Sequence, residues 1–138
     1  GLYASTSNGS LVTKNVSATK LDAINENGDT LLSGVEAEAI LATNFNGDIS
    51  LGGATAREAE VVNENGDISA QRLDITTSRI ECVNGDIYLS YLGAEDSYHI
   101  DAHTNQGDIV APQGADDAAR TIGVDSNLGD IQINFTSN

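Results

Sequence analysis

The sequence predicts an all-β fold: a single-stranded parallel β-helix, or β-solenoid, of about seven coils with 19 to 22 residues each. The first observation behind this prediction is a repeat set by seven glycines, which are separated by 19, 19, 19, 19, 22 and 22 residues. These are Gly9, Gly28, Gly47, Gly66, Gly85, Gly107 and Gly129. A period near 20 residues is typical of one structural unit stacked on copies of itself. The second observation is that only 4% of residues are aromatic, so small aliphatic side chains must fill a narrow core.

The residues around each glycine predict a sharp turn. Three of the seven copies read Asn-Gly-Asp-Ile in full. The others depart from it at Ser10 in place of Asp, at Leu11 and Thr30 in place of Ile, and at Gln106 and Leu128 in place of Asn. Glycine adopts left-handed backbone angles without steric cost, and Asn does so more readily than most residues. We therefore predict a structural column of turn glycines, made of Gly28, Gly47, Gly66, Gly85, Gly107 and Gly129.

Two strands are predicted to flank each turn. Small or apolar residues occupy positions seven, five and three before the glycine and positions two and four after it. In the third copy this inward set is Ile40, Ala42, Asn44, Ile49 and Leu51. Alternation with a period of two indicates a strand that turns one face to the interior.

A third alternation, at seven and nine residues after the glycine, predicts a third side for each coil and a roughly triangular cross-section. It comprises Val16 and Ala18, Val35 and Ala37, Ala54 and Ala56, Leu73 and Ile75, and Leu92 and Ala94. Segments 35–40 and 56–60 favour helix by composition, but stacked coils must share one backbone path, so we expect β structure throughout. We expect a right-handed coil, because parallel crossovers nearly always are.

The two 22-residue spacings place their extra residues at one corner of the coil, around Glu95–His99 and Gly114–Ala118. Insertions in solenoid repeats often gather on the working face, so this corner is the first place to expect a ligand. The alternative is a pair of tolerated surface loops.

A polar column is predicted inside the coil. Asn25, Asn44 and Asn63 lie three residues before their glycines, at inward positions, and we expect their amides to form an internal hydrogen-bonded ladder. The equivalent residues Cys82, Thr104 and Ser126 would continue it less well. Cys82 is the only cysteine, and at this position it is interpreted as a small buried apolar residue rather than a nucleophile.

An acidic column is predicted beside the turn glycines. Stacking would bring its carboxylates to about 4.8 Å, where two unit charges in water repel by about 1 kcal/mol. Hydrogen bonds from backbone amides could offset this repulsion, and so could a bound calcium ion. We expect no metal and no other cofactor; the weak candidates for a metal are Asp29, Asp48, Asp67, Asp86, Asp108 and Asp130.

Composition narrows the classes of partner and of catalytic chemistry. A formal charge of −15 repels nucleic acid and anionic lipid, so no nucleic-acid partner is expected. His99 and His103 are interpreted as surface histidines rather than a metal site. We expect one β-solenoid domain over residues 1–138, as a fragment of a longer exported or membrane-attached protein, with any membrane contact made through a segment outside this chain.

The repeated Asn-Gly-Asp-Ile motif, together with alternating strands and a coil of about 19 residues, resembles a bacterial adhesin family of β-solenoid proteins with Gly-Asp-Ile repeats. The resemblance covers all seven coils. It implies a parallel β-helix in the cell envelope, extracytoplasmic or exposed on the surface. It transfers no functional residues to this chain.

Three functions are compatible with the sequence. The leading hypothesis is a non-catalytic envelope or surface module, an adhesin that presents a rigid β face to surface glycans or proteins. The first alternative is a carbohydrate-active β-helix, a polysaccharide lyase or hydrolase, but no pair of acids beside an Arg recurs at neighbouring outward positions, so we expect no enzyme and no catalytic residues. The second alternative is a scaffold that polymerises through its coil ends, because Leu2, Ala4 and Thr6 leave the first coil without an obvious polar cap.

Overall fold

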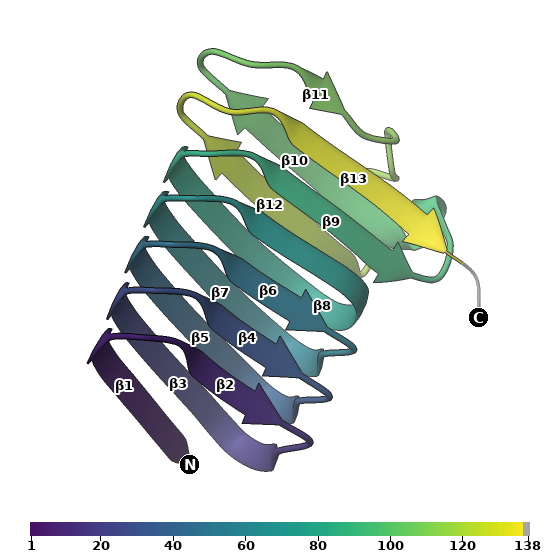
Figure 1. Ribbon diagram of the computed structural model, residues 1–138. Helices are drawn as coiled ribbons and strands as arrows, with labels where there is room; N and C mark the ends of the chain where they lie inside the picture. The colour runs from purple at the N-terminus through teal and green to yellow at the C-terminus, as the bar shows by residue number, and fades with distance from the viewer. Residues whose placement is uncertain (137–138) are drawn as a thin grey trace.

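The computed structural model describes residues 1–136 and shows a parallel β-solenoid of seven stacked levels (Figure 1). Each level contains one of the seven repeat glycines, and the pairings between named strands are all parallel. Within the described residues the one helix is the short 3-10 turn η1 (Glu95–Ser97). No helix in that part of the chain has the length and apolar character needed to cross a membrane. The predicted fold class is therefore confirmed.

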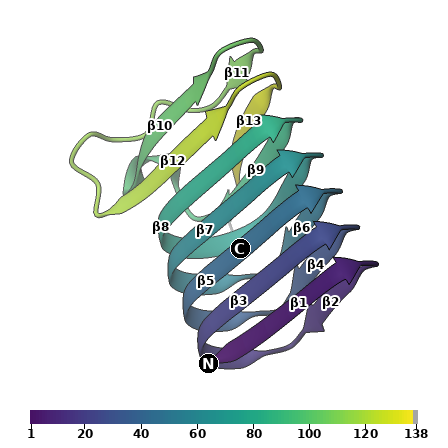
Figure 2. The same cartoon turned by 90° about the vertical axis from the view of Figure 1, so that its left-hand side faces the viewer.

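Two sheets enclose the interior. Sheet A, which faces the viewer in Figure 2, contains the strands that lead into the glycine corner. In chain order these are β1 (Leu2–Asn8), β3 (Ser17–Asn27), β5 (Glu36–Asn46), β7 (Thr55–Asn65), the second half of β8 (Ile68–Asn84), β10 (Tyr98–Thr104) and β12 (Arg120–Ser126). Sheet B contains the strands that follow the corner: β2 (Leu11–Lys14), β4 (Thr30–Ser33), β6 (Ile49–Gly52), the first half of β8, β9 (Ile87–Leu92), β11 (Ile109–Val110) and β13 (Ile131–Thr136).

A second corner, six residues after each glycine, returns the chain from sheet B to sheet A in the first four levels. It uses left-handed backbone angles, with φ values of 52°, 63°, 64° and 54° at Asn15, Gly34, Gly53 and Arg72. The predicted third side follows this corner, and its residues Val35 and Ala54 are fully buried. It is the curved beginning of the long sheet A strands rather than a strand of its own, as the curl of these strands in Figure 1 shows.

The fifth level lacks this second corner, and one inward prediction is wrong there. Tyr91 stands where the earlier levels have a left-handed residue, but it continues β9 and pairs with Leu73 of the level below. Tyr91 is consequently the fully buried side chain, whereas Leu92 is half-buried and Ala94 is exposed. The turn is delayed to Gly93, whose φ is 110°.

The interior between the sheets is apolar and continuous. The alternating positions predicted from the repeat supply it, and the largest fully buried aliphatic side chains are Leu21, Leu32, Ile49, Ile68, Leu73, Ile75, Ile80, Ile87, Leu89 and Ile122. Three aromatic rings, Tyr91, Tyr98 and Phe135, close the upper end of this core, with ring centroids 5.0 to 5.9 Å apart.

The last two repeats are not stacked in sequence order. Strand β12 pairs with β8, and β10 lies outside β12; likewise β13 pairs with β9, and β11 lies outside β13. The glycine column therefore runs from Gly85 to Gly129 and only then to Gly107. We number the levels 1 to 7 in this spatial order, so that level 6 holds Gly129 and level 7 holds Gly107.

The reversed order has a physical reason in the two repeats themselves. Pro112, the only proline in the chain, ends β11 after two residues because it has no N–H to donate to a neighbouring strand. A proline at this point is acceptable at an edge and costly in the middle of a sheet. The other repeat supplies a six-residue strand, β13, whose Ile131 and Ile133 are about 1% exposed beside β9. The extra residues of the first 22-residue repeat lie in the connection from β9 to β10, which climbs two levels. Those of the second lie in the connection from β11 to β12, which returns by one level.

Candidate functional site

The glycine corner is a tightly stacked column. A Cβ atom on Gly28, Gly47, Gly66, Gly85, Gly107 or Gly129 would overlap the carbonyl oxygen of the glycine one level below. Gly9 belongs to level 1 and has no heavy atom within 4 Å of that position. The stacking thus requires glycine at all six positions, and at Gly28, Gly47, Gly66 and Gly85 the left-handed backbone angle requires it as well.

The predicted acidic column runs along the same corner, and each of its carboxylates below level 7 has a backbone partner. The amide of Asp48 donates to Oδ1 of Asp29 at 2.9 Å. The four bonds above it, of 2.8 to 2.9 Å, join Asp67 to Asp48, Asp86 to Asp67, Asp130 to Asp86 and Asp108 to Asp130. Charge-assisted bonds of this kind stabilise a carboxylate by about 1.5–3 kcal/mol, which offsets the repulsion along the column. In residues 1–136 no group of three or more His, Cys, Asp and Glu side chains is placed to hold a metal.

The inner amides lie where expected, but they do not bond to one another. Asn25, Asn44 and Asn63 are fully buried. Nδ2 of Asn25 donates to the carbonyl of Gly9 at 3.1 Å and to that of Asp29 at 3.0 Å. Asn63 repeats this pattern with the carbonyls of Gly47 and Asp67. The prediction of an internal amide ladder is therefore wrong: the amides of Asn25 and Asn63 bond the corner carbonyls, and no hydrogen bond joins these two side chains to each other or to Asn44.

Shorter side chains take the same role at the upper levels. Cys82 Sγ, Ser126 Oγ and Thr104 Oγ1 donate to the glycine carbonyls of levels 4, 5 and 6 at 3.2, 3.3 and 2.8 Å. Burial first, and then the nearby carboxylates of Asp67 and Asp86, raise the pKa of the Cys82 thiol to about 11. A thiol that stays protonated at neutral pH is a poor nucleophile.

Asn44 departs from this pattern because of Thr30. Thr30 occupies an Ile position of the repeat and is buried, and its hydroxyl donates to Oδ1 of Asn44 at 3.4 Å. A hydroxyl where Ile has an ethyl group therefore gives the side-chain oxygen of Asn44 a partner. The substitution noted in the sequence is accommodated inside the coil.

The amide ladder of this molecule lies on the outside, in the Asn of each Asn-Gly pair. Asn46 donates to Asn27, Asn65 to Asn46 and Asn84 to Asn65 over 2.8 to 3.0 Å. Sequence reasoning missed this ladder although the recurring Asn residue signals it. At levels 6 and 7 it is replaced by a bond from Asn105 to Asn127, one residue earlier in the repeat.

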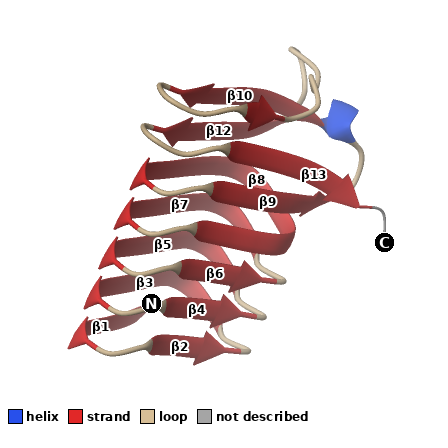
Figure 3. Cartoon of the chain, turned by 45° about the horizontal axis from the view of Figure 1, so that its top comes forward, coloured by secondary structure: helices blue, strands red, loops and turns tan. Residues whose placement is uncertain are grey.

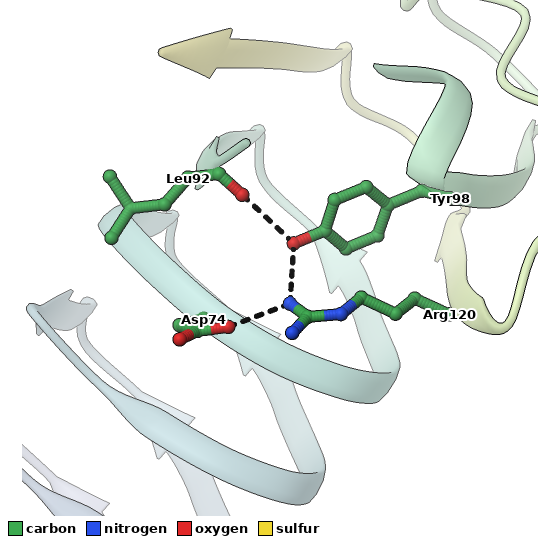
Figure 4. A network of polar contacts seen from close by, with 4 residues as sticks. All are labelled: Asp74, Leu92, Tyr98 and Arg120. Carbon is green, nitrogen blue, oxygen red and sulfur yellow. Dashed lines mark hydrogen bonds and ion pairs between the residues drawn. The ribbon is translucent and has the colours of Figure 1, made fainter. Parts of the chain in front are cut away.

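A polar network fastens the reversed levels to the regular ones (Figure 4). The Tyr98 hydroxyl donates to the carbonyl of Leu92 at 3.0 Å and accepts from Nη1 of Arg120 at 3.0 Å. The same nitrogen of Arg120 donates to Asp74 at 2.6 Å, and the guanidinium carbon lies 5.6 Å from the centre of the Tyr98 ring. The bond to Asp74, followed by the bond to Tyr98, raises the pKa of Arg120, so the guanidinium stays charged.

The insertion corner forms the upper end of the molecule, where Figure 3 shows η1 and the loop before β12. The loop folds onto level 7: Gly114 makes an antiparallel bridge to His99, and the amide of Ala115 donates to the carbonyl of Tyr98 at 2.8 Å. His99 Nδ1 lies 3.9 Å from a carboxylate oxygen of Asp116. A hollow of about 560 Å³ opens beside the loop, and its lining includes Ile100, Ala102, Ile109 and Ala111.

A second hollow lies on the outer face of sheet A. It has a volume of about 360 Å³ and lies where Gly123 supplies no side chain. Its charged and ionisable lining residues are Arg79, Glu81, Asp101, His103 and Asp125. The sequence could not show this grouping, because it depends on β12 lying between β8 and β10. Its polar groups lie on an open, solvated face, and Arg79 is already paired with Glu81 at 3.1 Å.

The outer face of sheet B differs from every other surface of this acidic chain. Its strands, with β8 counted from Ile68 to Gln71, contain no Asp or Glu, and Lys14 is their only charged residue. The acidic residues lie instead on sheet A, at the glycine corner and in the loops of the upper end. One outward row crosses all seven levels of sheet B and reads, in spatial order, Val12, Leu31, Ser50, Ser69, Tyr88, Gln132 and Val110.

The middle of this face is a shallow groove of about 440 Å³ between Leu31 and the corner residue Arg72, lined largely by Ser and Gly. Above it Tyr88 is 41% exposed, and its hydroxyl accepts from Nδ2 of Asn134 at 3.2 Å. The repeat motif itself does not mark this face. The absence of acidic residues two to five positions after each glycine was the available signal.

Comparison with known proteins gives a family and no individual relatives. No curated protein and no solved structure matches the chain. The family model described as Toastrack DUF4097 matches residues 1–134, nearly the whole chain. The chain therefore belongs to the Toastrack DUF4097 family.

Proposed function

We propose that this domain is a non-catalytic adhesion module of the cell envelope that binds uncharged glycans with the outer face of sheet B. The observation that carries the proposal is the absence of Asp and Glu from the sheet B strands of a chain with a formal charge of −15. A random distribution of so many carboxylates would place several on this face. Their exclusion from seven levels indicates a surface kept neutral for contact.

The chemistry of the face favours neutral sugars over charged polymers. Between Leu31 and Val110 the outward row carries hydroxyl and amide groups, from Ser50, Ser69 and Gln132, together with the ring of Tyr88. Hydroxyl and amide groups bond sugar hydroxyls, and an exposed aromatic ring offers an apolar surface for the face of a pyranose. An anionic polysaccharide would be repelled by the rest of the chain, and a cationic partner would prefer sheet A.

Rigidity supports a binding role for this face. Its strands are held by continuous parallel ladders and by the stacked corners on either side, so little conformational entropy is lost when a ligand lies across them. The stacked strands also place outward side chains at a regular interval of about 4.8 Å, which suits a repeating polymer.

The test is a binding measurement on immobilised polysaccharides, with neutral hexose and N-acetylhexosamine polymers compared against polymers of uronic acids. Tyr88→Ala is expected to weaken binding to the neutral polymers about tenfold. Phe45→Ala is the matched control, because Phe45 is 38% exposed on sheet A where Tyr88 is 41% exposed on sheet B. Tighter binding to the uronic acid polymers, equal losses in both variants, or no binding to any neutral polymer would contradict the proposal.

Two further measurements test the absence of catalysis and the location. Incubation with the same polysaccharides should release no unsaturated product and no new reducing ends; release that disappears in Asp101→Asn would favour the carbohydrate-active alternative, with the hollow at Gly123 as its site. Protease treatment of intact cells that express the full reading frame should cleave the domain if it is exposed on the surface. Protection until the cells are broken would refute a surface location.

A further inference from the structure

We propose that Asn84 is a site of spontaneous deamidation, a covalent modification from which the fold protects the other Asn-Gly pairs of the chain. Asparagine followed by glycine is chemically labile, because glycine has no side chain to keep its backbone nitrogen from the asparagine amide. Five such pairs occur, at Asn8, Asn27, Asn46, Asn65 and Asn84. All five asparagines are exposed, so solvent access does not distinguish them.

The modification consumes water and needs no other reactant. The backbone nitrogen of Gly85 loses its proton to solvent base and bonds to Cγ of Asn84, and the side-chain nitrogen leaves as ammonia. Water then opens the succinimide ring at either of its two carbonyl carbons, which gives aspartate or isoaspartate. The net change is the hydrolysis of one amide, without oxidation or reduction. Two groups therefore control the rate: the backbone amide of the glycine and the side-chain amide of the asparagine.

The glycine amide is bound in the lower levels and unbound at level 5. In levels 1 to 4 it donates to the carbonyl of the asparagine one level above, at 2.8 to 2.9 Å, and these donors are Gly9, Gly28, Gly47 and Gly66. A proton held in a hydrogen bond makes the nitrogen a poorer nucleophile. In residues 1–136 the amide of Gly85 donates to no acceptor. At level 6 the amides of Asn127 and Leu128 instead donate downward, to the carbonyls of Cys82 and Val83.

The side chain of Asn84 also lacks half of the restraint that the outer amide ladder gives to the others. In that ladder Oδ1 of each lower asparagine accepts from Nδ2 of the one above, at 2.8 to 3.3 Å. Asn84 donates to Asn65 at 2.8 Å, but among the described residues nothing donates to its own Oδ1. The ladder position of level 6 is occupied by Leu128, which has no amide. Asn84 is thus the one asparagine of the five without either protection in the part of the chain described.

The product would disturb the junction between levels 5 and 6. Isoaspartate carries the main chain through the side-chain carbon and so adds one backbone atom before Gly85. The carbonyl of Gly85 accepts from Ser126 at 3.3 Å, and a Cβ atom on Gly129 would overlap that carbonyl. A corner packed this tightly has no room for a longer chain. Hydrogen exchange of the modified protein should therefore rise in β12 and β13 and stay unchanged in β3, and equal exchange before and after modification would refute this consequence.

The experiment follows deamidation in the folded wild-type protein, incubated in mildly alkaline buffer and mapped by mass spectrometry. Trypsin places Asn65 and Asn84 in separate peptides, 58–72 and 80–120. Asn65 is the matched internal control, because it is equally followed by Gly-Asp-Ile and is also exposed. Asn84 should react at least about tenfold faster than Asn65, since it lacks two hydrogen bonds. In concentrated urea the two should react at similar rates. Equal rates in the folded protein overturn the proposal, and so does a preference for Asn84 that persists in urea.

A pair of variants at level 6 tests the cause. Leu128→Asn restores the asparagine of the repeat at a side chain that is 48% exposed, and its amide should donate to Oδ1 of Asn84. The rate at Asn84 should then fall at least about threefold. Leu128→Ala is the control, because it removes the same side chain without adding an amide, and its rate should match the wild type. Circular dichroism establishes that both variants are folded. An unchanged rate in Leu128→Asn, or an equal fall in Leu128→Ala, would refute the role given to the ladder.

Discussion

Levels 1 to 5 and levels 6 to 7 are built from the same repeat, but only levels 1 to 5 are stacked in the order of the sequence. In the first five levels the chain climbs one level per repeat, and every corner glycine contacts the previous one in sequence. After β9 the chain climbs two levels, forms β10 and β11, and returns to fill the gap with β12 and β13. The repeat motif thus determines which residues of a coil face inward, whereas the order of the coils depends on which repeat can serve as an edge.

The largest expected effect is a disulfide crosslink that forms in only one of the two possible stacking orders of the last two coils. In a Cys82→Ser background, Thr77→Cys with Thr121→Cys should form a disulfide, because these outward residues are register partners on neighbouring strands. Thr77→Cys with His99→Cys should not, because β12 lies between them and doubles the separation to about 9.6 Å, beyond disulfide range. Peptide mapping without reducing agent reads the result. A crosslink in the second pair would mean that the last coils stack in sequence order.

The next largest effect compares two glycines with similar backbone angles. Gly9 and Gly47 have φ values of 121° and 135°, but only a Cβ on Gly47 would overlap a carbonyl oxygen of the level below. Gly47→Ala should cost at least about 4 kcal/mol of the free energy of unfolding or prevent folding. Gly9→Ala should cost about 1 to 2 kcal/mol, from backbone strain alone. Urea unfolding followed by circular dichroism measures both, and equal losses would show that stacking adds nothing to the need for glycine.

A smaller effect tests the fastening of the reversed levels, using two buried tyrosines whose rings are 5.3 Å apart. Tyr98→Phe removes the hydroxyl that joins Leu92 and Arg120, and it should lower the free energy of unfolding by about 1–3 kcal/mol. Tyr91→Phe is the matched control, since the Tyr91 hydroxyl is buried without a hydrogen-bond partner, and burial also raises its pKa. We expect that variant to be neutral or slightly more stable.

The two tyrosine variants are best compared by thermal melting at equal protein concentration. A loss in Tyr91→Phe as large as in Tyr98→Phe would assign the effect to packing of the aromatic rings. The hydrogen bonds to Leu92 and Arg120 would then contribute little to holding levels 6 and 7.

Much of this architecture could be predicted from the sequence because each coil is local. The spacing of the glycines and the two-residue alternation place Leu21, Ile49 and Ile87 in the core and put the turns at the correct residues. The stacked Asp carboxylates were likewise predictable, since equal positions in successive coils must lie above one another. These features depend only on counting within a repeat.

What could not be predicted depends on relations between coils. The amides of Asn25 and Asn63 bond corner carbonyls rather than each other, and the repeat pattern does not show which acceptor lies within their reach. The order of the last levels follows from Pro112, whose missing N–H suits an edge strand. The repeat pattern alone does not show which of the two last coils lies at the edge. The grouping of Arg79 with Asp101 and Asp125 around Gly123 follows from that order and was equally hidden.

The smallest expected effect concerns the second corner, which the regular levels possess and level 5 has lost. Arg72 holds a left-handed φ of 54° that Gly34 and Gly53 adopt without a side chain. Arg72→Gly should raise the free energy of unfolding by about 1 kcal/mol or less, because relief of the strained angle exceeds the added freedom of the unfolded chain. Arg72→Ala keeps the strained angle while removing the charged side chain, so it should not raise the free energy of unfolding.

Gly53→Ala is the reverse change, with open space around its Cβ, and it should lower the free energy of unfolding by about 1 kcal/mol. Equal stability of Arg72→Gly and Arg72→Ala would mean that this corner tolerates any residue. The left-handed angle would then not explain why level 5 lacks the corner at Tyr91.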